Sequence, residues 1–400
     1  MLLIVISIFM CIFISVVFTK TNVFYGAEYN GSIVDFDIIY MSDSGNLMET
    51  NVYMNIGAPE NDIRQPLFGL FALPFGTIAW IVSKIFFSIP NAYPIIITII
   101  QAILLQICIL LIARLLFRDI LSKLAFSLIC LSLYPTLLFS VMAEQYVFAV
   151  FWLIVFIYSC LNNSIYKKFL LIAATGSLMP SGILFPLLMD SKNVKQSIKT
   201  LLKLALLFVI IIILAGQFQL LLVNIIPIGG GGTIAGLLNS FGGKSIDFSN
   251  RLLQYINFVS LCLFHPDEAS INYSNGYATW QLGNITTLNI KGIIILLLSI
   301  LGFVLNNKKT FARTCMGWVF FSFLILCLIG WGTAENGLIL YTLYFSWAFI
   351  SLIILGFEKI LSKYYMIKYI LYTIMFITLL WINSKGILEI IYFGLDKYPI

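Results

Sequence analysis

Long apolar runs separated by short polar stretches dominate the chain. A helix that crosses a lipid bilayer needs about 20 predominantly apolar residues. Runs near this length predict membrane-spanning helices at 2–19, 92–113, 124–142, 145–161, 201–227, 286–305, 314–332, 337–357 and 367–383. The first run lacks a basic start and a cleavage site of small residues before Lys20, so we expect a retained anchor rather than a signal peptide.

Two further apolar stretches fit this pattern less well. Residues 66–88 follow Arg64-Gln65-Pro66 and carry Lys84, which predicts a helix that lies in the outer membrane interface. Residues 169–189 are interrupted by Met179-Pro180-Ser181-Gly182, and proline and glycine disfavour a continuous helix. We therefore expect a broken hairpin that returns to the side from which it starts.

The composition excludes a soluble fold. Of 400 residues, 61% are hydrophobic and 10% are charged, against about 25% charged in a typical soluble domain. The 23 basic and 17 acidic side chains cannot cover the surface of a soluble core of this size. The fold class expected is an all-α integral membrane protein, a bundle of about 9–11 transmembrane helices with two loops on the outer face.

Basic residues set the expected orientation. Because Lys and Arg favour the cytoplasmic side, the side that collects most of them is assigned as cytoplasmic, although Lys20 lies on the other side. Fifteen of the 23 fall there: Arg114, Arg118, Lys123, Lys167, Lys168, Lys192, Lys195, Lys199, Lys203, Lys308, Lys309, Arg313, Lys359, Lys363 and Lys368. Richness in Ile, Lys and Asn is typical of an AT-rich bacterial genome, so we expect a bacterial plasma membrane protein with its site facing outside.

The acidic residues indicate where chemistry takes place, since only Asp119, Asp190 and Glu358 fall on the cytoplasmic side. Two hydrophilic stretches lie outside, 20–65 and 228–285, and the second opens with four glycines that favour a mobile loop. The predicted organisation is a module over 1–225 that includes the outer loop 20–65 and the interfacial helix 66–88, then the outer loop 228–285, then C-terminal transmembrane helices over 286–400.

Asp43 and Arg64 are the first candidates for chemistry. A carboxylate near the lipid surface can act as a general base, because partial desolvation raises its pKa toward neutrality. A guanidinium can bind a lipid-linked phosphate, because its fork matches phosphate oxygens. A base and a phosphate clamp are the minimum needed for sugar transfer from a polyprenyl-phosphate donor, although Asp43 alone could equally be a helix cap or a solvated loop charge.

Other outer residues are weaker candidates. Glu144 lies between two predicted spans, where an acidic side chain is costly unless it is paired, and it could equally mark a helix boundary. Lys244 and Arg251 could bind donor phosphate or be solvated loop charges. His265, in His265-Pro266-Asp267-Glu268, could hold a divalent cation or position an acceptor. Tyr277, with Tyr273 and Trp280, could stack on a sugar or anchor the loop at the interface.

Several classes of site are disfavoured. The seven cysteines form no CxxC pair and no Cys/His ligand spacing, so a zinc site and a disulfide scaffold are not expected. The basic residues are scattered between apolar runs, so no nucleic-acid partner is expected. No cofactor is certain from the sequence, and the requirement for a divalent cation stays open.

The order of these features resembles the GT-C class of membrane glycosyltransferases, which includes protein O-mannosyltransferases and aminoarabinose transferases. The resemblance covers about residues 1–225. It rests on an N-terminal span, an acidic outer loop, and a pre-proline element that leads an apolar helix. It continues with a basic turn and an outer acid, and ends with a Gly…Pro helix pair. The corresponding residues are Asp43, Arg64-Gln65-Pro66-Leu67, Ile112–Arg118, Ser140–Gln145 and Gly176–Gly182.

The resemblance implies roles for three residues. Asp43 falls where the family keeps the acid that deprotonates the acceptor, Arg64 near its His/Arg-Pro element, and Glu144 where many members keep a second outer acid. The chain departs from the pattern at Gln65, where His is frequent. Asp35 and Asp37 also compete with Asp43 for the role of base.

We therefore expect an inverting glycosyltransferase that moves a sugar from a polyprenyl-phosphate donor to a glycan, lipid or protein acceptor. A polymerase or ligase of envelope polysaccharides is an alternative, but such proteins use outer loops rich in Arg and His, whereas the early outer loop is acidic. A lipid-linked sugar flippase or transporter is a second alternative. Transport favours ionisable residues at mid-span, and the central predicted spans contain few.

Overall fold

The protein is a bundle of helices with two small β-hairpins. The computed structural model describes residues 2–26, 28–29, 32–33, 38–40, 42–49, 51–57, 64–86, 88–188, 194–217, 247–274, 277–331 and 338–400. Asp35 and Asp37, Lys244 and the four glycines lie outside these ranges.

Five helices of the described chain are long and apolar enough to cross a membrane. They are α3 (Phe68–Ile85), α4 (Ala92–Leu116), α15 (Thr310–Ser322) with its continuation η3 (Phe323–Ile329), α16 (Leu338–Ile360) and α17 (Tyr365–Lys397). A sixth would be the pair α5 (Ile120–Leu131) and α6 (Tyr134–Val141), which is bent by 67°. Shorter apolar helices include α1 (Leu2–Phe18), α7 (Tyr146–Leu161) and α14 (Ile290–Asn306). The helical membrane class is thus supported, while the predicted count of 9–11 spans stays a prediction.

Helix α16 forms the centre of the bundle. Nearly all of its residues are buried, and α4, α6, α7, α14 and α15 pack around it. The outer helices expose apolar side chains instead. On α17, Ile370, Ile374 and Ile377 are more than half exposed and recur at helical spacing, while Tyr372 on another face is buried. A continuous apolar outer face of this kind is compatible with lipid as the surrounding solvent.

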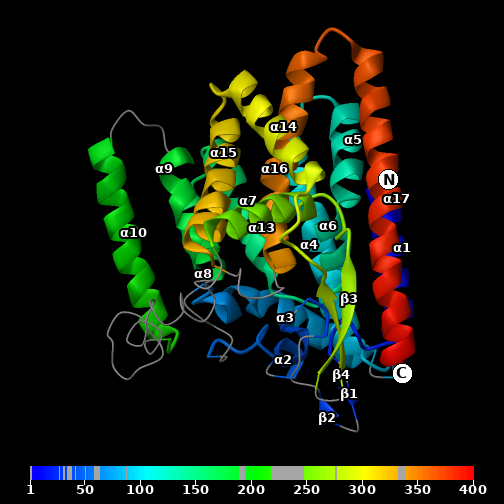
Figure 1. Ribbon diagram of the computed structural model, residues 1–400. Helices are drawn as coiled ribbons and strands as arrows, with labels where there is room; N and C mark the ends of the chain where they lie inside the picture. The colour runs from blue at the N-terminus through cyan, green and yellow to red at the C-terminus, as the bar shows by residue number, and fades with distance from the viewer. Residues whose placement is uncertain are drawn as a thin grey trace.

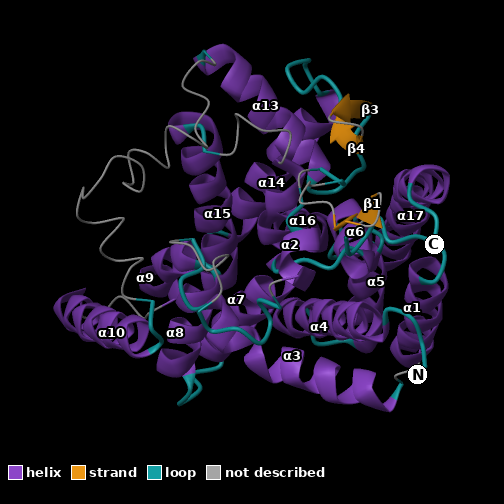
Figure 2. Cartoon of the chain, turned by 90° about the horizontal axis from the view of Figure 1, so that it is seen from below, coloured by secondary structure: helices purple, strands orange, loops and turns teal. Residues whose placement is uncertain are grey.

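Helix α3 lies across one end of the bundle rather than along it (Figures 1 and 2). The interfacial helix expected at 66–88 stays a prediction, since α3 is also long and apolar enough to cross a membrane. The segment 51–57 packs directly on α3, because a Cβ at Gly69 or Gly76 would collide with the backbone carbonyl oxygens of Asn55 or Tyr53. Residues 51–57 are thereby held against the end of the bundle.

The expected break in 169–189 is present. Helix α8 (Lys167–Ser177) ends before the extended residue Leu178, and the chain folds back through η1 (Met179–Leu184) and α9 (Phe185–Leu188). With 11 residues, α8 is about 16 Å long, roughly half the span of a bilayer. The tip of this hairpin is tied to the start of α3, since the Leu67 N–H donates to Gly176 O (2.9 Å) and the Met179 N–H to Arg64 O (2.8 Å).

The second hydrophilic stretch is more structured than a loop. It contains α13 (Phe248–Leu261) and the antiparallel strands β3 (Ala269–Ser274) and β4 (Tyr277–Leu282). Trp280 of β4 joins this hairpin to the segment 38–40: its N–H donates to Ile38 O (2.7 Å) and its carbonyl accepts from Tyr40 N–H (2.8 Å). Strands β1 (Glu28–Tyr29) and β2 (Ser32–Ile33) form the other hairpin, and α2 (Ser44–Glu49) follows.

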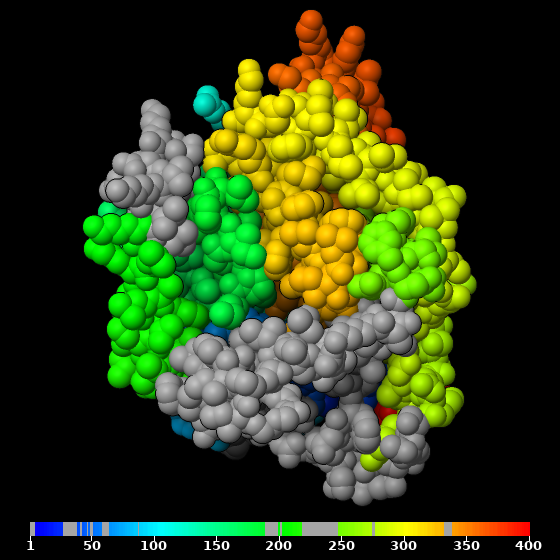
Figure 3. Space-filling model, turned by 60° about the vertical axis from the view of Figure 1, so that its left-hand side comes forward, coloured from blue at the N-terminus to red at the C-terminus, as the bar shows by residue number. Residues whose placement is uncertain are grey.

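The connections α4–α5, α14–α15 and α16–α17 lie at the end of the bundle opposite α3 (Figure 1). These connections and the helix ends beside them carry many of the described basic residues, among them Arg114, Arg118, Lys308, Lys309 and Lys359. Helix α10 (Val194–Leu214) lies at the edge of the bundle in the same view. Its Phe208 and Ile212 are buried in a cluster with Phe71 of α3 and Ile172 of α8, while many of its other apolar side chains are exposed. On the surface, α9 lies beside α15 (Figure 3).

Candidate functional site

A cavity of about 450 Å³ lies between the start of α3, the α8–α9 hairpin, η3 and the first turns of α7 and α16. Apolar and aromatic side chains form most of its wall, and polar side chains lie on one part of it. The lining residues are Arg64, Gln65, Gln145, Tyr146, Leu178, Met179, Pro180, Ile183, Trp318, Phe321, Ile325, Leu326, Trp331, Tyr341, Tyr344 and Phe345. We call it the aromatic cavity.

Arg64 and Gln65 are oriented by two tyrosines on α16. The Arg64 guanidinium donates from Nη1 to the Tyr341 hydroxyl (3.4 Å), and Gln65 Nε2 donates to the Tyr344 hydroxyl (2.8 Å). Tyr341 and Tyr344 are three residues apart, so they project from the same helical face. The start of α3 is therefore fixed from two sides, by α16 and by the hairpin tip.

Tyr146 links this group to two carboxylates. Its ring packs against Tyr344 (centroids 5.2 Å apart) and edge-on against Tyr341 (6.4 Å). Both Asp43 and Glu144 lie within electrostatic range of the Tyr146 hydroxyl. Three residues that the sequence singled out separately, Asp43, Glu144 and Arg64, thus converge beside the aromatic cavity.

Glu144 lies in the turn between α6 and α7 and is fully buried. Gln101 of α4 holds this turn. Its Nε2 donates to Phe139 O and Met142 O (2.7 Å each), and its Oε1 accepts from the Glu144 N–H (3.2 Å). Since Gln101 comes nine residues after the first residue of α4, the turn is recessed by about 13 Å from that end of the helix.

Tyr53 is a further neighbour of Glu144. It is fully buried between the rings of Phe68 and Phe148, with centroids 6.0 and 5.2 Å away. Burial, the nearby Glu144 carboxylate and Tyr93 hold the pKa of Tyr53 well above its ordinary value. Tyr53 therefore stays protonated at neutral pH and places a neutral hydroxyl near the Glu144 carboxylate.

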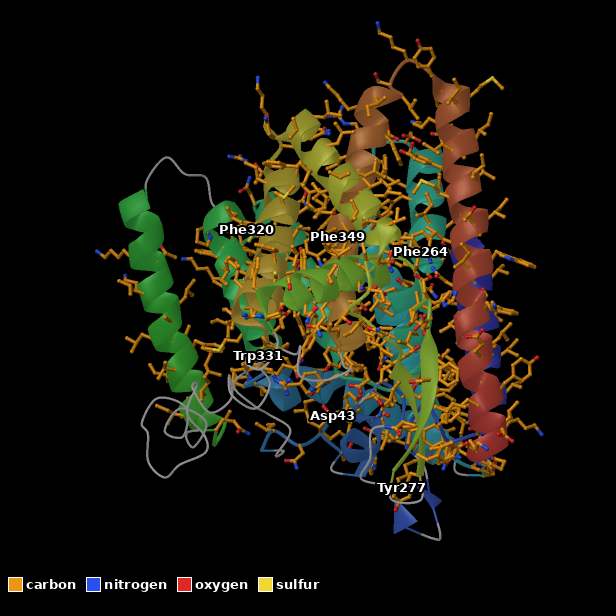
Figure 4. The ribbon with its side chains drawn as sticks, in the orientation of Figure 1. Asp43, Phe264, Tyr277, Phe320, Trp331 and Phe349 are labelled. Atoms are coloured by element: carbon orange, nitrogen blue, oxygen red, sulfur yellow. The ribbon has the colours of Figure 1, made fainter. Side chains whose placement is uncertain are left out.

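Asp43 is only partly buried and directly precedes α2. Its carbonyl accepts from Leu47 N–H (2.9 Å), which places it at the helix start. In Figure 4, Asp43 and Trp331 lie at the end of the bundle that α3 crosses. Of the two carboxylates, Asp43 is the one that a molecule arriving from outside the protein can reach.

Arg251, another predicted phosphate ligand, is not among the residues that line the aromatic cavity. Arg251, on the first turn of α13, donates from Nη1 to Leu328 O (3.1 Å). Leu328 belongs to η3, a π-helix whose Ile325 and Leu326 line the cavity. Arg251 thus supports the wall, and Lys244 lies outside the described residues.

His265 and Tyr277 lie elsewhere. The His265 N–H donates to Asn383 Oδ1 (2.9 Å), and its ring packs edge-on against Tyr134. Burial lowers the pKa of His265; the carbonyl of Pro266 and the charge of Glu389 oppose this shift. Tyr277 begins β4 and is half-buried, and Figure 4 shows it at the far end of the hairpin from Phe264.

The described residues offer no group of three or more His, Cys, Asp and Glu side chains that could hold a metal ion. The aromatic cavity itself is lined by none of these residue types. Among the described residues, the wall of the aromatic cavity therefore offers no ligand set for a metal ion.

Several residues of the site were not anticipated. Gln101 could have been identified from the sequence, because it is an amide within an apolar helix of 25 residues and a buried amide requires hydrogen-bond partners. Tyr341 and Tyr344 left only a weak signal, the recurrence of tyrosine at helical spacing early in a predicted span. The π-helix at 323–329 and the position of Trp331 left no local signal.

Comparison of the chain with protein-family models, with curated proteins and with solved structures found no match.

Proposed function

We propose that the protein is a membrane glycosyltransferase of the GT-C type that transfers a sugar from a polyprenyl-phosphate donor. One observation carries the proposal: Arg64 lies in the wall of an apolar cavity while Asp43 and Glu144 lie close by. A cation beside an apolar cavity matches an amphiphile with an anionic head and a hydrocarbon tail.

The donor fits this arrangement in two parts. The phosphate meets the Arg64 guanidinium, which Tyr341 orients, and the first isoprene units fill the cavity between Ile183, Trp331 and Phe345. Apolar contact with the tail stabilises binding by about 0.8 kcal/mol for each buried methylene. The sugar then extends from the phosphate toward the carboxylates.

The reaction is a single displacement at the anomeric carbon. Asp43 takes the proton of the acceptor hydroxyl as that oxygen forms a bond to the anomeric carbon. The bond from this carbon to the phosphate oxygen breaks, and polyprenyl phosphate leaves with the electron pair, stabilised by Arg64. Attack on the face opposite the leaving group inverts the anomeric configuration.

The two acids have different roles. Asp43 is accessible and can meet an acceptor, whereas Glu144 is fully buried in a turn held by Gln101. Glu144 is therefore held in a fixed position near the site, where its carboxylate would favour positive charge developing on the sugar ring in the transition state.

The positions of the basic residues support an orientation. They gather at the end of the bundle opposite α3, and the excess of Lys and Arg favours the cytoplasm. We assign the α3 end, with Asp43, to the outer face of a bacterial plasma membrane, where a glycan, lipid or protein acceptor is available.

The test is turnover by the full chain in lipid vesicles with a panel of polyprenyl-phosphate sugars, with free polyprenyl phosphate as the measured product. Release that depends on an added acceptor supports transfer. If a labelled lipid-linked sugar crosses the bilayer intact and no polyprenyl phosphate appears, the protein is a transporter and the proposal fails.

A further inference from the structure

A second, polar pocket of about 280 Å³ lies on another part of the molecule, between α13, the start of β3, the loop 283–289 and the first turn of α14. It shares no lining residue with the aromatic cavity. Its volume is just below the range of about 300–1,000 Å³ usual for small-molecule pockets. It therefore suits one small ligand.

The walls of this pocket are fixed by their own hydrogen bonds. Asn257 Nδ2 donates to two carbonyls of the loop 285–287 (2.9 and 2.7 Å), and its Oδ1 accepts from Asn289 Nδ2 (3.1 Å). Asn289 also donates to Asp267 Oδ2 (3.2 Å), and Asp267 is ion-paired with Lys291. A pocket with such walls needs little reordering when a ligand binds.

Three polar groups of the lining are left available. Within the part of the chain that the structure describes, the Glu268 carboxylate, the Ser260 hydroxyl and the Asn284 side-chain amide N–H form no hydrogen bond with protein. Because Lys291 compensates Asp267, the remaining charge is that of Glu268. The pocket thus offers acceptors and a donor with one extra negative charge, which disfavours an anion and suits a neutral polyhydroxylated ring.

We propose that this pocket binds one neutral sugar residue of a glycan acceptor. The β3–β4 hairpin connects the pocket to the chain around Asp43. Strand β3 begins directly after Glu268, and Trp280 of β4 pairs with the segment 38–40, which ends three residues before Asp43 (Figure 1). The proposal that the pocket binds a sugar does not depend on the transferase activity. The proposal that this sugar belongs to the acceptor rests on the proposed transferase activity.

Binding is measured on the full chain in lipid nanodiscs, without donor, by calorimetric titration of the methyl glycosides of glucose, galactose, mannose, rhamnose and N-acetylglucosamine. At least one should bind saturably. Glu268→Gln should weaken it about tenfold or more, because a hydrogen bond to a charged group is worth about 1.5–3 kcal/mol. Ser260→Ala should weaken it less, and Asp396→Asn, which changes an exposed carboxylate at the end of α17, should leave it unchanged.

The outcomes separate the two proposals. Absence of binding at concentrations up to about 50 mM, or equal binding by wild type and Glu268→Gln, overturns the pocket. If the protein binds the sugar in a way that depends on Glu268 but has no transfer activity, the proposal of a sugar-binding pocket stands. The proposal that the pocket is an acceptor subsite then fails. Where transfer occurs, Glu268→Gln should raise the KM for a glycan acceptor at unchanged kcat, and an unchanged KM contradicts the subsite.

Discussion

The side chain of Gln101 fixes the backbone of Glu144. Its amide bridges the carbonyls at the end of α6 and the Glu144 N–H, so one residue of an apolar helix satisfies three backbone groups of a buried turn. An acidic residue is thereby held about 13 Å inside the end of α4. We regard Gln101 as a positioning residue for Glu144.

Gln101→Leu should destabilise the protein by about 2–4 kcal/mol, because a buried backbone group without a partner costs about 1–3 kcal/mol. The measurement is the denaturant midpoint in detergent, together with turnover. The matched control is Gln106→Leu on the same helix, where the Gln106 side-chain carbonyl accepts a single hydrogen bond within the described part of the chain, from Ser7 (2.7 Å). Equal losses for the two variants would contradict the role of Gln101.

Replacing Arg64 should act on the donor. Arg64→Ala should raise the KM for the lipid donor about tenfold to a hundredfold, since a charge-assisted hydrogen bond is worth about 1.5–3 kcal/mol. Arg64→Lys should raise the KM for the donor by a smaller factor, because lysine keeps the positive charge but lacks the planar guanidinium. Steady-state kinetics with a soluble acceptor measure this, and Arg313→Ala, at an exposed position of α15, is the control. A donor KM unchanged in Arg64→Ala would remove Arg64 from the donor site.

Filling the aromatic cavity should select against long lipids. Ile183 lines the cavity and is half exposed, so a tryptophan there can occupy the space proposed for the first isoprene units without overpacking a closed core. Ile183→Trp should reduce kcat/KM for a full-length polyprenyl donor about tenfold or more, equivalent to about 1.4 kcal/mol, and a truncated donor much less. Ile294→Trp, on the exposed face of α14, is the control. Equal effects on donors of both lengths would place the tail elsewhere.

His265 should make stability depend on pH. Burial lowers its pKa below the ordinary value of 6.5, so the unfolded chain binds a proton that the folded protein does not. Stability should therefore fall as the pH drops below about 6.5. Thermal midpoints measured between pH 8 and pH 5 should decline more in wild type than in His265→Gln. If the thermal midpoints of wild type and His265→Gln decline in parallel with pH, His265 has the same pKa in the folded and unfolded protein.

Much of the helical organisation follows from apolar runs. The runs at 92–113 and 337–357 match α4 and α16 within a few residues, because a helix needs about 20 apolar residues to match the thickness of the bilayer. The run at 124–142 is instead bent between α5 and α6, where Pro135 lacks an N–H for the continuing helix. The hairpin 269–282 was missed, although Tyr277–Leu282 is a short β-rich segment containing Tyr, Thr and Trp, a composition that favours a strand.

The site was predictable in its parts and not in its assembly. Arg64 and Glu144 were identifiable as polar residues at the edges of apolar runs, and Asp43 as a carboxylate of the hydrophilic stretch 20–65. Their convergence depends on Tyr146 and on Tyr341 and Tyr344 of α16, which meet only in the folded bundle. No local pattern predicts contacts over such separations, nor that Arg251 supports η3 while His265 lines a different pocket.

The most direct test is sugar transfer by the reconstituted full chain, with wild type beside Asp43→Asn. Asparagine keeps the size of the side chain but cannot accept the acceptor's proton, so turnover should fall by at least about a hundredfold with unchanged folding. Release of polyprenyl phosphate by wild type and its loss in Asp43→Asn are expected if Asp43 is the general base. Equal turnover by both proteins would contradict this role and move the base to another acid of the outer face.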